Sequence, residues 1–337
     1  MKKIIPVILS LCLIFLLSGC GSTIQEGMVY DSQTPMKEKD KIVVGVSQIG
    51  SESVWRTANT LSIQKTFSKE NGYVLIFDNA RQKQENQIKA IRNFISLQVD
   101  YIVFSPLTEH GWETVLQEAK EANIPVILMD RKIALKDTSL YTTWVGSDFF
   151  EEGIKAGKWL EGNLASEKEQ EEEINIVVLR GTSGSSSVLG RSKGFESIAA
   201  KHSNWHIIEQ ADGDYTTAKG KEAMKSLLNK HDKIDVLVSQ NDDMTFGAVE
   251  ALKEMGISTG VGGDITIISF DAVKRALLMV QQGAINVDIE CNPDQGPEIS
   301  RVIQALENGK TVEKSYFVDE IVFTPQNVEQ YIEYRLY

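Results

Sequence analysis

The feature that most constrains the fold is an alternation of two kinds of segment that runs from residue 41 almost to the end of the chain. Short apolar runs rich in β-branched residues are separated by longer stretches in which apolar residues recur at helical spacing. Within the runs, apolar residues do not alternate with polar ones, which is typical of parallel strands buried on both faces. The runs are residues 42–46, 73–77, 101–104, 125–129, 174–179, 205–208, 234–238, 265–270 and 284–289. This order predicts an α/β protein with doubly wound parallel sheets.

The helical stretches and one break in the pattern predict two sheets rather than one. Amphipathic patterns cover residues 55–71, 85–99, 112–123, 151–164, 217–228, 246–255 and 273–282. After residues 141–148 and a long helix comes an acidic run at 167–173, which we interpret as a solvated helix end and loop. The strand and helix alternation then restarts at Ile174. We expect two similar sheets in series, about 41–144 and 146–289, with later segments crossing back.

Length, composition and charge narrow the class of protein. A chain of 337 residues suits about two domains at roughly 150 residues each. Hydrophobic residues make up 42% and charged residues 24%, which excludes a collagen, a coiled coil and a globally disordered chain. The formal net charge is −12, and an acidic protein repels phosphate backbones. We therefore expect no nucleic-acid partner.

The first nineteen residues resemble the signal peptide of a bacterial lipoprotein. A basic start at 1–3 precedes an almost wholly apolar stretch at 4–17, and residues 17–20 (LSGC) match the lipobox pattern. The resemblance implies cleavage before Cys20 and a lipid on its sulfur, which would anchor the protein to the cell membrane. A retained transmembrane helix is the alternative, but about 14 apolar residues fall short of the roughly 20 that span a bilayer. Residues 20–40, which begin with the lipidated cysteine, are polar and aperiodic, as suits a flexible tether.

Polar side chains gather where the predicted strands end. Open α/β sheets bind ligands in the crevice beyond the carboxyl ends of their strands, so these side chains are candidates for a site. They are Ser51, Glu52, Ser53, Trp55 and Arg56 after the first strand, Asp130 and Arg131 after the fourth, Asn241, Asp271 and Glu290 after later strands, and Arg191 on the helix that follows 174–179. Their shared location, more than any single residue, indicates a binding site.

This set of side chains fits a small neutral polyol. Hydroxyl groups require carboxylate acceptors, guanidinium donors and amides, and C–H faces require an aromatic surface. The acids and bases are nearly balanced, whereas an anionic ligand would require a surplus of cations. Structural alternatives exist for each residue. Asp130 with Arg131 can form a strand-end ion pair, Trp55 can pack into the core, and Asn241 can cap a helix, as can a serine before Trp55.

Catalytic and cofactor motifs are not found in the sequence. Residues 181–187 (GTSGSSS) lack the Lys-Ser or Lys-Thr of a phosphate loop, and 212–214 lack the further carboxylates of a calcium loop. The four histidines form no H-E-x-x-H, and no G-x-S-x-G occurs. Cys291 has no C-x-x-C companion and is expected to be a small buried side chain. We expect no enzyme activity, no cofactor and no metal ion. An enzyme acting on sugars is the alternative, because an acidic protein offers many carboxylate pairs.

Four long segments resemble the ribose-type periplasmic sugar-binding proteins, the solute receptors of ABC importers, and among them the branch that binds galactofuranose. The segments are VGVSQIGSESVWR (44–56), RQKQENQIKAIRNF (81–94), GWETVLQEAKEANIPVILMDR (111–131) and NDDMTFGAVEALKEMG (241–256). The resemblance extends over roughly 41–310 and implies a periplasmic binding protein type I fold, in which two lobes joined by a three-segment hinge close on one sugar. It implies an N-terminal lobe of 41–144 plus 291–316 and a C-terminal lobe of 146–289 plus 317–337.

The resemblance also implies ligand contacts at the matched positions. Residues 52–56 match the ligand segment of the family except that Val54 replaces a glycine. The other matches are Asp130 and Arg131 for the adjacent acid and base, Arg191 for the second-lobe arginine, Asn241 and Asp271 for the remaining polar pair, and Glu290 for a glutamine that ribose-binding members carry at a crossover.

The implied role is capture of a monosaccharide, either galactofuranose-like or galactose or arabinose, and docking on an ABC permease with its ATPase. A sugar sensor that docks on a membrane histidine kinase or a chemoreceptor would use the same clamp. We also expect a monomer. A lipid-anchored extracytoplasmic receptor suits a cell with one membrane, so we infer a Gram-positive source. A LacI-type regulator shares the fold of the ligand domain, but the lipobox and the lack of an N-terminal helix-turn-helix oppose it.

Overall fold

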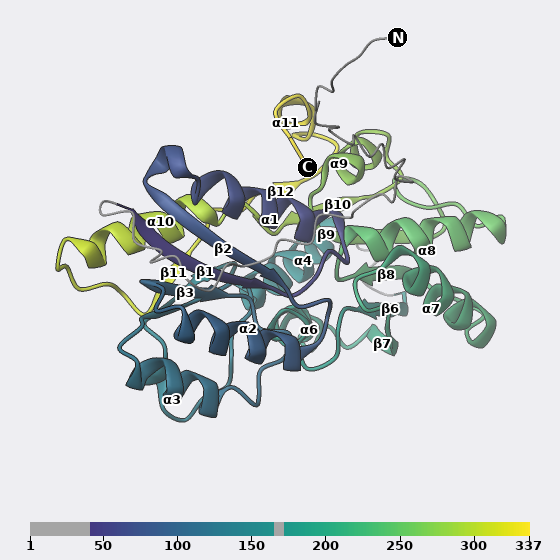
Figure 1. Cartoon of the computed structure of the whole chain (residues 1–337). Helices are drawn as coiled ribbons and strands as arrows, with labels where there is room; N and C mark the ends of the chain where they lie inside the picture. Colours follow the sequence, from purple (N-terminus) through teal and green to yellow (C-terminus); the bar gives the residue numbers. More distant parts are fainter. Residues whose placement is uncertain (1–40, 165–171) are drawn as a thin grey trace, which may run out of the picture. The chain divides into compact units, whose positions relative to one another are not determined.

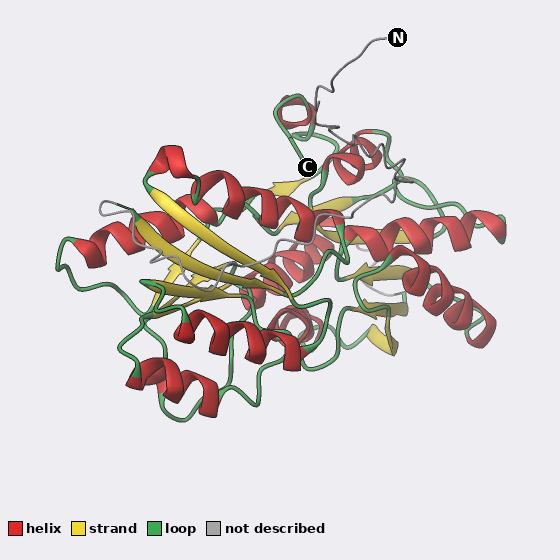
Figure 2. Cartoon of the chain, in the orientation of Figure 1, coloured by secondary structure: helices red, strands yellow, loops and turns green. Residues whose placement is uncertain are grey.

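The computed structural model describes residues 41–164 and 172–337, and both of its β-sheets belong to one compact unit. The predicted signal peptide, Cys20 and the predicted tether lie outside the described residues, as does most of the acidic run. Helices cover the two sheets, as Figures 1 and 2 show. The prediction of an α/β protein with two doubly wound, mainly parallel lobes is confirmed.

The first sheet has six strands in the order β11-β5-β4-β3-β1-β2. Every neighbouring pair in it is parallel. Its strands are β1 (Ile42–Gln48), β2 (Tyr73–Asn79), β3 (Tyr101–Phe104), β4 (Val126–Met129), β5 (Thr143–Gly146) and β11 (Ser315–Phe317). The strand order reverses at β1, and such a reversal opens a crevice for ligands beyond the carboxyl ends.

The second sheet repeats this arrangement in the order β12-β10-β9-β8-β6-β7. Its strands are β6 (Ile174–Arg180), β7 (Trp205–Asp212), β8 (Val236–Ser239), β9 (Thr266–Asp271), β10 (Val287–Glu290) and β12 (Val322–Phe323). Only the pairing of β12 with β10 is antiparallel within this sheet. The order reverses at β6, so each sheet contributes one ligand crevice of the same kind.

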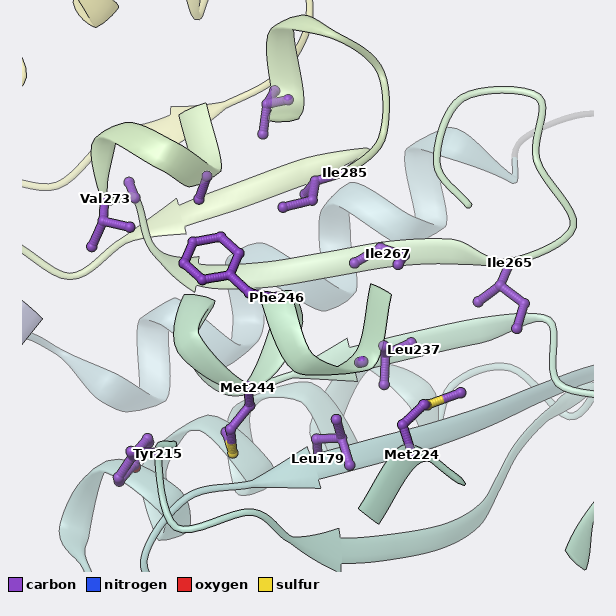
Figure 3. Close-up of a cluster of buried hydrophobic side chains, with 14 of the residues drawn as sticks. Leu179, Tyr215, Met224, Leu237, Met244, Phe246, Ile265, Ile267, Val273 and Ile285 are labelled. Carbon is purple, nitrogen blue, oxygen red and sulfur yellow. The ribbon is translucent and has the colours of Figure 1, made fainter. Parts of the chain in front are cut away.

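Strand β6 shows why its sequence is apolar without alternation. Successive side chains of a strand point to opposite faces. Val177 and Leu179 belong to the core cluster on one face of the second sheet, whereas Ile176 and Val178 belong to the cluster on the other face. The first of these clusters is drawn in Figure 3, where Tyr215 lies at one end beside Met244. Both faces are therefore buried.

Helices pack on both sheets and begin close to strand ends. Those of the first lobe are α1 (Val54–Thr66), α2 (Gln84–Ser96), α3 (Glu113–Glu121) and α10 (Gly296–Glu307), with the 3-10 turns η1 (Lys69–Asn71) and η2 (Thr138–Leu140). Those of the second lobe are α4 (Phe149–Asn163), α6 (Ser186–Ala199), α7 (Thr217–Lys230), α8 (Asp242–Glu254), α9 (Lys274–Gln281) and α11 (Glu329–Ile332). Five of them are capped by a side chain that accepts a hydrogen bond from the first turn, namely Ser53, Asp148, Ser185, Thr216 and Asn241.

The chain passes between the two sheets three times. It leaves the first sheet after β5 and enters α4 through residues 147–148, and it returns after β10 through residues 291–295 to α10. The third crossing, residues 318–321, joins β11 of the first sheet to β12 of the second. We call these segments the three crossovers, and they join the lobes at one side.

The structure differs from the sequence-based expectations at several element ends. Strand β5 forms within residues 141–148, where the sequence analysis predicted no strand. The helix expected at 55–71 ends at Thr66, because the side chain of Asn71 donates to the carbonyls of Lys65 and Thr66 and closes the helix there. Strand pairing places Gly146 and Phe317 in the first sheet, so both were assigned to the wrong lobe. Apart from these, the lobe boundaries given above stay our proposal.

Candidate functional site

A cavity lies between the loops that follow the strands of the two sheets. It holds about 310 Å³ of empty space, part of it open to solvent. Its lining consists of Glu52, Ser53, Trp55, Arg56, Asp130, Arg131, Phe149, Ser187, Arg191, Tyr215, Asn241, Asp271 and Cys291.

Most of the residues predicted from the sequence meet in this cavity. Those that line it are Glu52, Ser53, Trp55, Arg56, Asp130, Arg131, Arg191, Asn241 and Asp271. Ser51 and Glu290 do not belong to the lining. We call the expectation that ligands bind beyond the carboxyl ends of the strands the strand-end rule. This rule identified side chains from segments that lie far apart in the sequence.

Arg56 is the centre of an ion-pair network on the first-lobe side. Glu52 lies just before Ser53, the cap of α1, and Arg56 lies in the first turn of that helix. Nε of Arg56 lies 3.0 Å from Oε1 of Glu52, and Nη2 lies 2.8 Å from Oδ2 of Asp130. Burial opposes the charge of the guanidinium, but the charges of Asp130 and Glu52 raise its pKa above the ordinary value. Arg56 is therefore a permanently charged donor held in a fixed orientation.

Asp130 is held in a strained backbone conformation. Its φ is +61°, in the left-handed region, where a non-glycine residue costs roughly 1–3 kcal/mol. Gly146 of β5 makes room for it, since a Cβ atom there would lie 2.9 Å from the carbonyl oxygen of Asp130. Nε1 of Trp144 donates to that carbonyl at 2.9 Å, and Oγ of Ser105 donates to the carboxylate at 2.9 Å. These contacts fix the carboxylate toward the cavity side of β4.

Glu52 has a buried carboxylate oxygen without a hydrogen-bond partner among the described residues. Its Oε1 pairs with Arg56, whereas its Oε2 has no partner, and the side chain is only 5% exposed. An unmatched buried acceptor costs about 1–3 kcal/mol, and more when it is charged. Because Glu52 lines the cavity, a ligand hydroxyl would supply the missing donor.

Arg131 and Tyr215 face each other from opposite lobes. Cζ of Arg131 lies 5.3 Å from the centre of the Tyr215 ring, and its Nη1 donates to the carbonyl of Leu107 at 3.0 Å. Burial and then the charge of Arg56 lower the pKa of Arg131. Burial raises the pKa of Tyr215, although Arg191 and Arg131 oppose this. The two side chains place a cation against an aromatic face at the boundary between the lobes.

Arg191 of α6 is the second-lobe counterpart of Arg56. Its Nε lies 2.6 Å from Oε2 of Glu152, its Nη2 lies 3.3 Å from Oδ1 of Asp271, and its Nη1 donates to the carbonyl of Gln240. Burial opposes the charge, but Glu152 and other neighbours raise the pKa of Arg191 well above its ordinary value. Burial raises the pKa of Asp271, and the charge of Arg191 opposes that shift. Arg191 therefore stays charged and is held on several sides.

Asn241 combines a structural and a cavity-lining role. Its Oδ1 accepts from the backbone N–H of Met244 at 2.9 Å and caps α8, as the structural alternative predicted. Its Nδ2 donates to the carbonyl of Tyr215 at 3.4 Å. The hydroxyl of Tyr215 in turn lies 2.7 Å from Oγ of Ser187. This chain of contacts connects the starts of α8 and α6 through the loop between β7 and α7.

The sequence missed Phe149, Ser187, Tyr215 and Cys291. Strand β7 runs to Asp212, farther than predicted, so the turn that leads to Tyr215 stands at a strand end. Phe149 likewise follows β5, which was not recognised as a strand. Applying the strand-end rule to β5 and to the full length of β7 would have found both aromatic residues. Ser187 lies in the stretch 181–187, which was considered only as a phosphate loop and excluded as one.

Glu290 and Ser51 do not face the cavity. Glu290 was predicted as a ligand residue, but its carboxylate accepts from the backbone N–H of Ile321 at 2.9 Å and lies 2.7 Å from Nη1 of Arg335. It therefore ties β10 to the C-terminal segment. Ser51 is exposed in the loop before α1.

Several hydrogen bonds join the lobes around the cavity. The backbone N–H of Val54 donates to Oδ2 of Asp243 at 3.1 Å, and that of Lys132 donates to Oγ of Ser186 at 2.8 Å. On the crossover side, Nε1 of Trp55 donates to the carbonyl of Cys291 at 2.6 Å. Hydrogen bonds thus join the lobes at a crossover and also between loops outside the crossovers.

Residues 44–311 match the family described as periplasmic binding protein domain. The chain belongs to this family. The match includes the strands that end at the cavity and every residue that lines it.

Relatives of this periplasmic binding protein bind sugars. It is 38% identical over 296 residues to the galactofuranose-binding protein YtfQ of Escherichia coli (strain K12), covering 87% of this chain and 91% of that protein. A solved structure from Mycobacterium smegmatis, in complex with β-D-fucofuranose, has a TM-score of 0.83 and 39% identity, covering 87% of this chain and 95% of that one. The periplasmic component of the arabinose ABC transporter from Shewanella sp. ANA-3, bound to α- and β-L-arabinofuranose, has a TM-score of 0.81 and 38% identity, with coverage of 87% and 95%.

These findings confirm three expectations for this periplasmic binding protein. It has the type I fold, it is a receptor of an extracytoplasmic family, and it is a solute-binding protein and not an enzyme. None of the helices within 41–164 and 172–337 combines the length and hydrophobicity that a membrane span requires.

Proposed function

We propose that this periplasmic binding protein is the sugar receptor of an ABC importer and that it binds one furanose sugar in the cavity between its lobes. The observation that carries the proposal is the cavity lining, in which charged groups of both signs surround one unmatched buried oxygen of Glu52. A hydroxyl-rich neutral ligand can satisfy such a lining, because each hydroxyl both donates and accepts.

The charges of the lining support a neutral ligand. Its carboxylates are Glu52, Asp130 and Asp271, and its guanidiniums are Arg56, Arg131 and Arg191. Equal numbers of acids and arginines leave no surplus charge for an anion or a cation to neutralise. Trp55, Phe149 and Tyr215 add aromatic surface, which suits the C–H faces of a sugar ring. We propose the nine predicted residues that line the cavity, together with these aromatics, as the ligand contacts.

The relatives support a five-membered ring. The proteins named above carry galactofuranose, fucofuranose and arabinofuranose in their descriptions, and these sugars share a furanose ring while differing beyond it. We therefore infer a galactofuranose-like sugar, with arabinose or galactose as the other members of the proposed ligand class.

Calorimetric titration tests this proposal. The protein without residues 1–20 would be titrated with a galactofuranoside, arabinose, galactose, ribose and glucose. We expect saturable one-to-one binding to the first, or to a sugar that populates a furanose ring, with a Kd of micromolar or tighter, equivalent to about −8 kcal/mol. The absence of binding to every one of these sugars would overturn the sugar assignment. Preferential binding of glucose would overturn the furanose assignment.

The lipid anchor is a separate part of the proposal. Residues 17–20 match a lipobox, and the relatives belong to an extracytoplasmic family. We infer that Cys20 is lipidated and holds the protein on the outer face of the cell membrane. Cys20→Ser should release the protein from membranes without changing its affinity, as judged by fractionation and titration. Persistent membrane retention of this variant would favour a retained N-terminal helix.

The proposed partner is the permease with its ATPase, and we expect the receptor to act as a monomer. A sensor kinase or chemoreceptor is the second candidate, because the same two-lobed clamp could dock there. Two observations distinguish the permease from the sensor as partner. The first is which genes lie beside the gene for this receptor, and the second is whether the sugar-loaded receptor stimulates ATP hydrolysis by a reconstituted importer. Stimulated kinase phosphorylation with no effect on the importer would favour the sensor.

A further inference from the structure

Three crossovers and the start of α4 place a group of ionisable side chains together, beside the cavity. Glu152 lies in the first turn of α4, Cys291 lies on the second crossover and Glu320 on the third. One carboxylate oxygen of each glutamate and the sulfur of Cys291 all lie within 4.8 Å of one another. Oγ of Ser147, on the first crossover, lies 3.3 Å from that sulfur.

The cations nearby do not balance this cluster if both glutamates are ionised. Oε2 of Glu152 pairs with Arg191 at 2.6 Å, but Arg191 also lies 3.3 Å from Asp271. Nζ of Lys155 lies 4.0 Å from Oε2 of Glu320, and the side chain of Glu320 is only 4% exposed. Three buried carboxylates would therefore share one close guanidinium and one more distant ammonium. Two ionised carboxylates this close in a buried site repel each other, and a guanidinium shared with Asp271 does not neutralise both of them.

A shared proton removes this conflict and also accounts for an otherwise unmatched atom. Oε1 of the completely buried Glu152 has no donor among the described residues. One carboxylate oxygen of Glu320 lies within 4.8 Å of one of Glu152, so a protonated Glu320 that turns toward Glu152 would donate to it. Burial, and next the charge of Glu152, raise the pKa of Glu320 to about 9. Burial and Glu152 also raise the pKa of the Cys291 thiol well above its ordinary value, so the cysteine stays protonated.

Arg191 connects this proton to the cavity. The same guanidinium contacts Glu152 on the crossover side and Asp271 in the cavity lining. If Glu320 loses its proton, the repelled carboxylate of Glu152 shifts, and Arg191 shifts with it. The crossovers are also the segments whose backbone must change when the lobes move, so repulsion there would alter the lobe angle.

We propose that Glu152 is a positioning residue for Arg191, and that one proton shared by Glu152 and Glu320 at the crossovers couples ligand affinity to pH. The coupling rests on the proposed function, because it requires a ligand in this cavity, whereas the shared proton does not. The charged and titratable groups that face the pair are Lys155 of α4, Arg191 of α6, Asp271 of β9 and Cys291.

Infrared spectroscopy tests the proton without any ligand. The wild-type protein at pH 7.5 should show the carbonyl stretch of a buried carboxylic acid, and Glu320→Gln should remove part of that band. Glu121→Gln, an exposed residue of α3, should leave it unchanged. An identical band in wild type and Glu320→Gln would overturn the proposal. Tight binding of Zn²⁺ that abolishes the band would also overturn it and make the cluster a metal site.

Titrations from pH 7 to pH 10 with the sugar found above test the coupling. Wild-type affinity should fall about tenfold as pH passes 9, whereas that of Glu320→Gln should stay flat. Glu152→Gln should weaken binding about tenfold at every pH, and Glu152→Asp should restore part of the loss. Parallel profiles for wild type and Glu320→Gln would overturn the coupling. An acid band with no binding to any sugar would refute the proposed function alone.

Discussion

The indole Nε1 of Trp55 donates a hydrogen bond to the carbonyl oxygen of Cys291 at 2.6 Å, although the two residues lie 236 positions apart. Trp55 opens α1 in the first lobe, and Cys291 begins the second crossover. Both also line the cavity. One wall of the cavity is therefore fastened directly to a segment that joins the lobes.

Trp55→Phe should lower both stability and affinity. The ring packing is largely kept, but the buried Cys291 carbonyl loses its donor, which costs about 1–2 kcal/mol in the free energy of unfolding. We expect affinity to fall about fivefold, since about 1 kcal/mol of that loss would act on the closed cavity. Urea unfolding and calorimetry measure the two effects. Trp112→Phe is the matched control, because Trp112 donates to Thr108 within the first lobe. It should lower stability alone, and equal effects of the two variants on affinity would contradict the assignment.

Glu52→Gln should weaken ligand binding much more than it affects the fold. The substitution removes the charge of the unmatched oxygen, and hydrogen bonds to charged groups contribute about 1.5–3 kcal/mol. Affinity should therefore fall about 10- to 150-fold in a calorimetric titration. Glu85→Gln, at an exposed position in the first turn of α2, serves as the control and should bind normally. Normal binding by Glu52→Gln would remove this side chain from the site.

Gly153→Ala should disturb the position of Arg191 through its backbone. A Cβ atom at Gly153 would lie 2.3 Å from the carbonyl oxygen of Arg191, where α4 and α6 approach closely. We expect a loss of about 1–3 kcal/mol in the free energy of unfolding, with weaker ligand binding. Gly162→Ala lies on the same helix with nothing within 4 Å, and it should be neutral or up to about 1 kcal/mol more stable. Denaturant unfolding measures the stability of both variants. Equal changes in the free energy of unfolding of the two variants would contradict this packing.

Asp288→Asn should flatten the dependence of stability on pH. Asp242 and Asp288 form a second buried carboxyl pair, and burial raises the pKa of Asp288 from about 3.8 to about 7. An acid with a raised folded-state pKa stabilises the protein fully below its unfolded-state pKa, and this contribution is lost as pH rises toward 7. Wild-type stability should decrease across that window by about 1.4 kcal/mol per pH unit from this pair. Unfolding curves between pH 4.5 and pH 7.5 would show a shallower slope for Asp288→Asn, and an unchanged slope would place the titrating group elsewhere.

The sequence predicted those parts of the site that depend on strand order. Because both sheets are buried on both faces, their strands appear as continuous apolar runs, and the residues just after them are easily located. Asp130, Arg131, Asn241 and Asp271 were found in this way and meet in one cavity. Arg191 was added because its helix follows such a strand end.

The parts that the sequence did not predict depend on features without a local signal. Strand β5 (TWVG) contains a threonine and a glycine among its four residues, and β11 and β12 have three and two residues, so no apolar run marks them. The pairing of Glu290 with Arg335 depends on where the C-terminal segment returns, which follows from tertiary packing alone. Phe149 and Cys291 reach the cavity because of the crossovers. The sequence order implied crossovers but did not indicate which side chains they would present.

Tyr215 has a consequence for how this receptor could change its ligand. Its ring belongs to the core cluster of the second lobe and also lines the cavity, and it lies so close to Gly181 that a Cβ atom there would come within 1.8 Å of the ring. A substitution of Tyr215 would therefore alter folding and recognition together. Arg131, on the facing lobe, contacts this ring as a charged side chain and donates to the carbonyl of Leu107, so a substitution there removes polar contacts rather than apolar core packing. New specificities in this scaffold should therefore arise at Arg131 before they arise at Tyr215.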